Sequence, residues 1–403
     1  MIRWLHISDL HIKNKADWNS FKKELVAKCE KIGVIDFVVV TGDFHDFSDK
    51  GDFSLAEAFL KQLMKELKLD IQKSLFVVPG NHDGVSSVLD KNTYISAAIG
   101  KPLELEEKWL NVLYGAFEDY EVFVKKLIPD YPVNHPARVH HRDWNSKINF
   151  IHCNTALVAD GKQKGNQLLD IDKLVMEEYR KDIPNIILAH NSFKDLNVEH
   201  QKRIQDVIRT NPVCAYFCGD KHIEEVEQIT YESNQNKQIP CVVSYKSSPE
   251  ATDSYSVFGM IIGEWREEEP TAYLRGWTWK SGIGFKTDAV ITEQEIDMTG
   301  RLERKSEANV NIEDKILLER KKYEKIPEEK VVKKDVEEVE KRRFVKLYYS
   351  MTPDQREKIN RKYPFKNIKL KKKMEPKELI QYVEWVEEEG LLEQMIRDMK
   401  NMF

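Results

Sequence analysis

The sequence predicts an α/β protein: a two-sheet sandwich flanked by helices, followed by a small C-terminal all-α bundle. Short apolar runs of strand length alternate with amphipathic segments of helical period, which is typical of a layered α/β fold. Beyond about residue 290 this alternation gives way to charged and then helical sequence. The clearest strand-like runs lie at residues 4–7, 37–40, 75–78, 186–188 and 213–217.

Helices are expected between these strands. Residues 17–32 carry Phe21, Leu25 and Val26 at helical spacing, and residues 54–69 repeat the period. Residues 101–136 interrupt the rhythm with a long helical pattern that ends in several prolines. This segment is an inserted excursion, and the sequence leaves open whether it covers a site or simply packs against the sheet edge.

The later part of the chain changes character twice. Strand-like runs at 241–245, 257–262 and 272–279 predict a second sheet packed against the first. Residues 291–345 are dense in Lys, Arg, Glu and Asp and are expected to form a charged linker. Apolar helical periodicity returns in residues 346–403 and predicts a small interaction domain. The main domain is therefore expected to span residues 1–290.

Composition restricts the class of protein. A chain of 403 residues with 41% hydrophobic residues can bury a sizeable core, and its net charge of −5 does not favour a general binder of polyanions. The five cysteines form no CxxC pair and are expected to be buried apolar residues. Because no signal-like or membrane-length apolar run occurs, we expect a cytoplasmic protein without a membrane partner.

Polar motifs follow each of the five apolar runs. Parallel strands gather their carboxyl ends along one edge, so these motifs are expected to converge. Carboxylates and imidazoles that meet in this way suit two divalent ions, which hydrolyse phosphate esters by sharing a bridging hydroxide and clamping the phosphoryl oxygens. The motifs are Asp9-Leu10-His11, Gly42-Asp43, Gly80-Asn81-His82-Asp83, Ala189-His190-Asn191 and Gly219-Asp220-Lys221-His222.

Individual roles follow from residue type and position. Asp9 and His11 are two residues apart and can hold one ion together. Asp43 suits the position between the ions, because Gly42 allows the backbone to approach them closely. The remaining motifs supply an amide oxygen, an imidazole and a final carboxylate–imidazole pair, from Asn81, His190, Asp220 and His222.

This ordered set resembles the signature of the calcineurin-like metallophosphoesterases over roughly residues 1–285. The block Gly80-Asn81-His82-Asp83 is its most specific part. The resemblance implies a first metal held by Asp9, His11, Asp43 and His222, and a second held by Asp43, Asn81, His190 and the residue at position 220. It also implies two catalytic residues that are not ligands: His82 as the acid for the leaving group, and Asp46 as the carboxylate that orients His82.

Position 220 departs from the family pattern, which usually has His there. We expect Asp220 to remain a ligand, because carboxylates also bind divalent ions. The additional oxygen ligand favours Mn²⁺, Mg²⁺ or Fe²⁺ over Zn²⁺, and Mn²⁺ is the expected cofactor at both positions.

The sequence favours a phosphodiesterase or nuclease that acts on nucleic acid or a nucleotide. Two alternatives stay open: a phosphomonoesterase acting on protein or a small molecule, and a pseudo-enzyme that serves as a signalling scaffold. Residues 377–392 resemble the small death-like adaptor domains of bacterial effectors. That resemblance implies an effector recruited to a protein partner through residues 346–403, although a tail that stabilises its own catalytic domain fits the sequence equally well.

Overall fold

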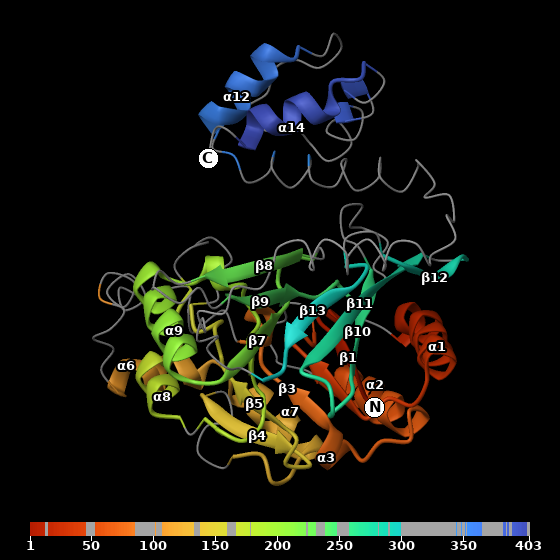
Figure 1. Ribbon diagram of the computed structural model, residues 1–403, viewed down its shortest axis with the longest axis vertical. Helices are drawn as coiled ribbons and strands as arrows, with labels where there is room; N and C mark the ends of the chain where they lie inside the picture. The colour runs from red at the N-terminus through yellow and green to blue at the C-terminus, as the bar shows by residue number, and fades with distance from the viewer. Residues whose placement is uncertain are drawn as a thin grey trace, which may run out of the picture. The chain divides into compact units, whose positions relative to one another are not determined.

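The computed structural model divides into two compact units, Met1–Glu250 with Ser256–Lys305 and Ala251–Tyr255 with Ser306–Phe403 (Figure 1). The residues that the structure describes are 1–12, 15–45, 53–84, 101, 107–132, 138–158, 167–177, 179–222, 225–230, 238–247, 258–280, 282–288, 291–299, 344, 348, 351, 353–364, 382–383, 385–386 and 389–400.

The first sheet of the larger unit joins the N-terminal strands to strands from late in the sequence. Its order is β12-β11-β10-β1-β2-β3, with β13 paired to β11. The pairs β1–β2 and β2–β3 are parallel, whereas β10 runs antiparallel to β1. The strands are β1 (Ile2–Ile7), β2 (Phe37–Val40), β3 (Leu75–Val77), β10 (Gly259–Trp265), β11 (Thr271–Lys280), β12 (Gly284–Thr287) and β13 (Gln294–Asp297).

The second sheet has the order β4-β5-β6-β7-β9-β8. Its four central strands, β5, β6, β7 and β9, are parallel, and the edge strands β4 and β8 are antiparallel to their neighbours. The strands are β4 (His140–Trp144), β5 (Ile148–His152), β6 (Asn185–Leu188), β7 (Val213–Cys218), β8 (Glu225–Thr230) and β9 (Gln238–Val243).

The alternation of side chains along each strand builds a four-layer sandwich. Phe37 and Val39 of β2 pack in the layer between the sheets, together with side chains such as Phe150 and Phe217 of the second sheet. Val38 and Val40 of the same strand face the helices instead. Because both faces of the central strands are covered, these strands are apolar throughout rather than alternating with polar residues.

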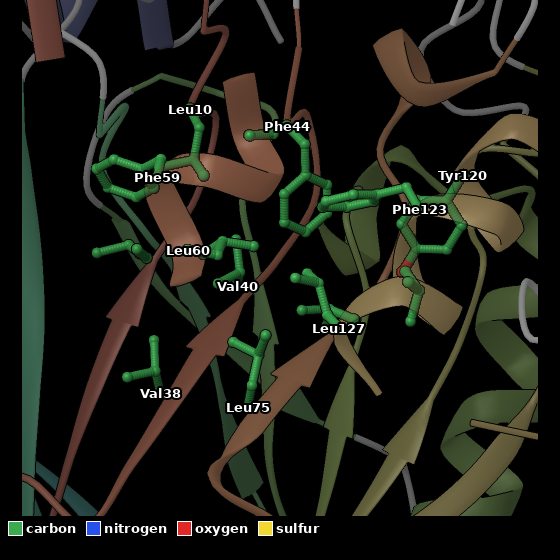
Figure 2. Close-up of a cluster of buried hydrophobic side chains, with 14 of the residues drawn as sticks. Leu10, Val38, Val40, Phe44, Phe59, Leu60, Leu75, Tyr120, Phe123 and Leu127 are labelled. Carbon is green, nitrogen blue, oxygen red and sulfur yellow. The ribbon is translucent and has the colours of Figure 1, made fainter. Parts of the chain in front are cut away.

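Helices cover the outer face of each sheet. The helices α1 (Lys15–Ile32), α2 (Ser54–Glu66) and α7 (Glu118–Leu127) contribute to the cluster on the first sheet, and α8 (Ile171–Met176) and α9 (Val198–Thr210) to that on the second. Figure 2 shows side chains of α2 and α7 meeting Val38, Val40 and Leu75. Leu10 and Phe44 belong to this cluster, so the loops after β1 and β2 are anchored in the core.

The predicted α/β sandwich is confirmed, and all five strand-like runs form strands. One expectation was wrong: the five runs do not share one sheet, and the late strands do not form a second sheet by themselves. The strands β1, β2 and β3 lie in one sheet, whereas β6 and β7 lie in the other, and late strands complete both. The excursion at residues 101–136 contains α6 (Glu107–Gly115) and α7. The strand β13 lies within the range expected to be linker.

The smaller unit has an apolar core of its own. Its described helices are α12 (Pro353–Lys362) and α14 (Leu392–Lys400), and Tyr348, Ile359, Tyr382, Val386 and Met395 are among the side chains buried there. The hydroxyl of Tyr382 donates to the carbonyl oxygen of Tyr363 at 2.7 Å, which satisfies a buried polar group. In the described part of the chain, no helix is long and apolar enough to cross a membrane.

Candidate metal centre

The predicted ligands lie just past the carboxyl ends of strands from both sheets. Asp9 and His11 follow β1, Asp43 follows β2, His190 follows β6, and Asp220 and His222 follow β7. Asn81 and His82 follow β3 in a single 3-10 turn (Asn81–Asp83). Backbone hydrogen bonds hold the loops together, from Asp9 N to the Gly42 carbonyl oxygen at 3.0 Å and from Gly219 N to the His190 carbonyl oxygen at 2.8 Å.

Four of these side chains form one convergent set, in which the ligand atoms of Asp9, His11, Asp43 and His222 all lie within 4.8 Å of one another. The Nε2 atoms of His11 and His222 are 3.1 Å apart. Nε2 of His222 lies 3.2 Å from Oδ1 of Asp9, and Nε2 of His11 lies 3.5 Å from Oδ2 of Asp43.

A second set converges on His190. Its Nε2 lies 2.8 Å from Oδ1 of Asn81, 3.4 Å from Oδ2 of Asp43 and 3.6 Å from Oδ1 of Asp220. The same Oδ2 atom of Asp43 therefore neighbours His11 in the first set and His190 in the second. The structure brings all seven predicted ligands together, and Asp43 stands between the two sets.

Several atoms in the centre are placed to coordinate a metal ion rather than to form hydrogen bonds with one another. Nδ1 of His190 lies 2.7 Å from the carbonyl oxygen of Thr41, so a proton on Nδ1 leaves a lone pair on Nε2 that faces three oxygens. Oδ1 of Asp9 is buried and accepts no hydrogen bond from the described residues. A cation between such atoms would satisfy both.

Charge interactions in the centre are strong because Asp9, Asp43 and His190 are almost completely buried. Burial opposes ionisation of Asp43, but the neighbouring His190 and His11 imidazoles outweigh it and hold the pKa of that carboxyl below its usual range. Burial likewise opposes protonation of His190, yet the carboxylates of Asp43 and Asp220 raise its pKa well above the ordinary value. The site therefore favours positive charge among its carboxylates.

The backbone is strained at several of the predicted ligands. Eight described residues other than glycine have positive φ angles, and five of them are predicted ligands. A left-handed conformation is costly for side chains other than glycine, and it persists where the surrounding structure imposes it, commonly at functional sites. The five are Asp9 (52°), His11 (40°), Asp43 (56°), Asp220 (68°) and His222 (55°).

Two glycines allow the loops that carry the predicted ligands to approach one another closely. Gly42 has a φ of 94°, and a Cβ there would lie 2.6 Å from Nδ1 of His190. A Cβ at Gly80 would lie 2.1 Å from Oδ1 of Asp43. Any larger residue at either position would displace a predicted ligand.

His82 lies beside the two sets rather than within them. Its backbone N–H donates to Oδ1 of Asp43 at 2.9 Å, and its Nε2 lies 3.9 Å from Oδ2 of the same carboxylate. Its ring meets that of His11 edge-on at 4.7 Å. With 26% of its side chain exposed, His82 borders solvent at the mouth of the centre. Asp46, the predicted orienting carboxylate, lies outside the described residues.

Sequence reasoning assigned no role to Asp83, which supports the whole arrangement. Its buried carboxylate accepts hydrogen bonds from the backbone N–H groups of Asp43, Phe44 and Gly80 at 2.8, 2.9 and 2.8 Å. Burial, together with the nearby charge of Asp43, raises the pKa of Asp83 to about 8, although the backbone donors oppose this shift. The signal was its place three residues after Gly80, where a side chain can reach back to the start of a helical turn.

Comparison with known proteins agrees with this geometry. The sequence profile described as calcineurin-like phosphoesterase matches residues 2–224. The chain therefore belongs to the calcineurin-like phosphoesterase family, as the sequence motifs predicted. The family implies metal-dependent phosphoester hydrolysis with two divalent ions, and the cluster of Asp9, His11, Asp43 and His222 is a candidate metal site here.

Solved structures resemble the chain weakly. Vps29 from Entamoeba histolytica, complexed with Zn²⁺, is 10% identical over 73% of this chain and 99% of its own, with a TM-score of 0.34. GAP50, the anchor in the inner membrane complex of Plasmodium, is 13% identical over 74% and 89%, with a TM-score of 0.36. The NAD nucleotidase of Haemophilus influenzae is 11% identical over 71% and 48%, with a TM-score of 0.28. No curated protein matches the chain.

Replacing Asp83 by Ala should destabilise the protein and weaken the centre together. The change strands three buried N–H groups, each worth about 1–3 kcal/mol, so we expect the free energy of unfolding to fall by about 3 kcal/mol or more. Denaturant unfolding measures this loss. The matched control Asp206→Ala removes an exposed carboxylate on α9 and should change the free energy by less than about 0.5 kcal/mol. Equal stabilities of the two variants would contradict the supporting role of Asp83.

Proposed function

We propose that the protein is a two-metal phosphohydrolase that acts on phosphodiesters, with nucleic acid or a nucleotide as the substrate class. The observation that carries this proposal is the Asp43 carboxylate, whose Oδ2 lies 3.5 Å from one imidazole nitrogen and 3.4 Å from another in separate ligand sets. A buried carboxylate shared in this way suits two adjacent cations.

Each residue then has a defined task. Asp9, His11, Asp43 and His222 would hold the first ion, and Asp43, Asn81, His190 and Asp220 the second. The bound ions would supply Lewis-acid stabilisation of the phosphoryl oxygens and activation of water. His82, on the exposed side of the centre, would donate a proton to the leaving oxygen, and Asp46 would orient its imidazole. The exposure of His82 supports its assignment as an acid that meets substrate.

The preference for diesters rests on charge. Two divalent ions with Asp9 and Asp43 leave two positive charges, and an ionised Asp220 reduces this to one. Adding hydroxide then makes the centre neutral, which favours a monoanionic diester over a dianionic monoester. The 3.6 Å separation between Oδ1 of Asp220 and Nε2 of His190 supports the inclusion of Asp220 in the set. Four carboxylate or amide oxygen ligands also favour Mn²⁺, with Mg²⁺, Fe²⁺ and Zn²⁺ as alternatives.

We also propose that residues 346–403 recruit a protein partner. The apolar core of the smaller unit, which includes Tyr348, Tyr382 and Met395, supports a role as a separate module. Deleting the module should abolish capture of that partner while small diesters are still hydrolysed. A partner that the truncated chain still captures would contradict the proposal.

The function is tested by restoring metals to metal-stripped protein. Mn²⁺, Mg²⁺, Fe²⁺ and Zn²⁺ are added separately, and a phosphomonoester, a phosphodiester and single- and double-stranded nucleic acid are offered as substrates. We expect Mn²⁺ to restore diester hydrolysis, and Asp43→Ala to lose both ions and nearly all activity. An Asp43→Ala protein that still binds two ions by elemental analysis would contradict the shared carboxylate.

Replacing His82 by Ala should slow turnover without changing metal content, because His82 is not one of the ligands. General acid catalysis contributes about 10²–10⁴-fold, and this contribution is greatest for poor leaving groups. Rates are therefore compared across diesters with good and poor leaving groups. The control His141→Ala removes a histidine paired with Glu177 and should leave every rate unchanged. An equal loss for all leaving groups in His82→Ala would exclude the acid role.

Replacing Asp220 by His should shift the protein toward monoesters and Zn²⁺. The substitution raises the charge of the centre by one unit, and one charge about 4 Å away is worth roughly 4 kcal/mol at an effective dielectric constant of ~20 before screening. The ratio of diester to monoester turnover reports the shift. If Asp220→His and Asp220→Ala both leave that ratio and the metal content unchanged, Asp220 is not a ligand.

A further inference from the structure

The loop that carries Asp220 and His222 has a largely covered lysine between these two predicted ligands. The side chain of Lys221 is only 12% exposed, whereas those of Asp220 and His222 are 25% and 30% exposed. A buried ammonium group is stable only when carboxylates compensate its charge. We call Lys221 and the three carboxylates that surround it the lysine clamp: Lys221, Asp195, Glu225 and Glu227.

The lysine clamp joins three separate segments. Nζ of Lys221 donates to Oε1 of Glu227 at 3.1 Å and lies 3.5 Å from Oε2 of Glu225, both on the edge strand β8. It also lies 4.0 Å from Oδ2 of Asp195, at the end of the 3-10 turn Phe193–Asp195. That turn begins three residues after His190 in the sequence, so the clamp connects the loop of one predicted ligand to the segment that follows another.

The carboxylates of the clamp are themselves held in place. Ser192 Oγ donates to Oδ2 of Asp195 at 2.7 Å, and Lys194 Nζ lies 3.1 Å from the same Oε1 of Glu227 that Lys221 contacts. The side chain of Glu227 is 5% exposed. Nζ of Lys221 lies within 4.0 Å of all three carboxylates, and its side chain is mostly covered, so its contacts are ion pairs largely sheltered from water.

The loop needs such an anchor because its backbone is strained. Asp220 and His222 adopt φ angles of 68° and 55°, and contacts outside these two residues must maintain those conformations. Two more bonds reach the loop from the centre: Gly219 N to the His190 carbonyl oxygen at 2.8 Å, and Asp220 N to Oδ2 of Asp9 at 3.1 Å. The lysine clamp adds contacts that are separate from the metal centre, since none of its carboxylates is a predicted ligand.

We propose that Lys221 is a positioning residue, and that the lysine clamp sets the distance between Asp220 and His190 before the second metal ion binds. This inference rests on the proposed two-metal function and deepens it. The first ion would take only His222 from this loop and would keep Asp9, His11 and Asp43, which lie outside it. The second ion draws on both segments that the clamp joins, so loss of the clamp weakens the second ion more than the first.

The test is Lys221→Met, which keeps the length of the side chain and removes its charge. Mn²⁺ is titrated into metal-stripped full-length protein by calorimetry. Loss of groups that orient metal ligands typically costs about 10–100-fold in affinity, so the dissociation constant of the second Mn²⁺ should rise by that factor. Lys221→Arg should retain most of the affinity. Lys202→Met, which removes an exposed ion pair with Glu199, is the matched control and should bind both ions like the unchanged chain.

A second variant keeps the proposal testable if Lys221→Met folds poorly. Glu225→Gln removes one partner at the partly exposed side of the clamp and should weaken the second ion in the same direction, to a smaller extent. A clamp that only stabilises the fold would lower the melting temperature of metal-free protein and leave both dissociation constants unchanged, and that result overturns the proposal.

The outcome also separates this inference from the proposed function. If Lys221→Met and Glu225→Gln bind Mn²⁺ like the Lys202→Met control while Asp43→Ala binds none, the metal centre stands and the role of Lys221 is rejected. If Asp43→Ala binds both ions normally, the metal centre is assigned to the wrong residues, and the proposed role of Lys221 is rejected together with it.

Discussion

The arrangement of the whole site depends on one buried carboxylate that lies between two groups of predicted ligands. Oδ2 of Asp43 lies within 3.5 Å of Nε2 of His11 and 3.4 Å of Nε2 of His190, which come from different sheets. An anionic oxygen cannot be buried without compensating positive charge. Because Asp43 is buried at the junction of the sheets, the imidazoles of His190 and His11 compensate its charge in the fold itself.

The loop that carries Asp43 has a strained backbone, and hydrogen bonds and core packing hold that loop in place. Asp43 itself has a φ of 56°, and the Asp83 carboxylate fixes its N–H together with those of Phe44 and Gly80. Phe44 in turn packs against Phe123 of α7 at a ring separation of 5.2 Å. The helical core in Figure 2 therefore continues directly into the loop that carries the shared ligand. Stable strands and helices are what allow unfavourable loop conformations to persist.

Much of this could be predicted from the sequence, because the signals are local. An apolar run that ends in a short polar motif places Asp9, Asp43 or His190 at a strand end whichever sheet the strand joins. The division of the strands between two sheets could not be predicted, since β1 pairs with β10 across more than two hundred residues and periodicity carries no information about partners. Asp83 and Lys221 were missed for a related reason: Asp83 contacts backbone N–H groups and Lys221 contacts carboxylates that include Asp195 of another segment, and residue type alone does not reveal such contacts.

The residues of the centre differ in their access to water, and this difference does not follow the two ligand sets, since His222 is 30% exposed and His190 is fully buried. Asp9 and Asp43 have side-chain exposures of 0% and 2%, whereas Asp220 is 25% exposed and His82 26%. Charges on the buried side chains interact strongly with one another, while water screens part of the charge on Asp220. Asp220, the residue that departs from the family pattern, borders solvent, so a change of its charge would act on molecules that approach from solvent more than on the fold. Replacing Asp220 should therefore disturb the fold less than replacing the buried Asp43.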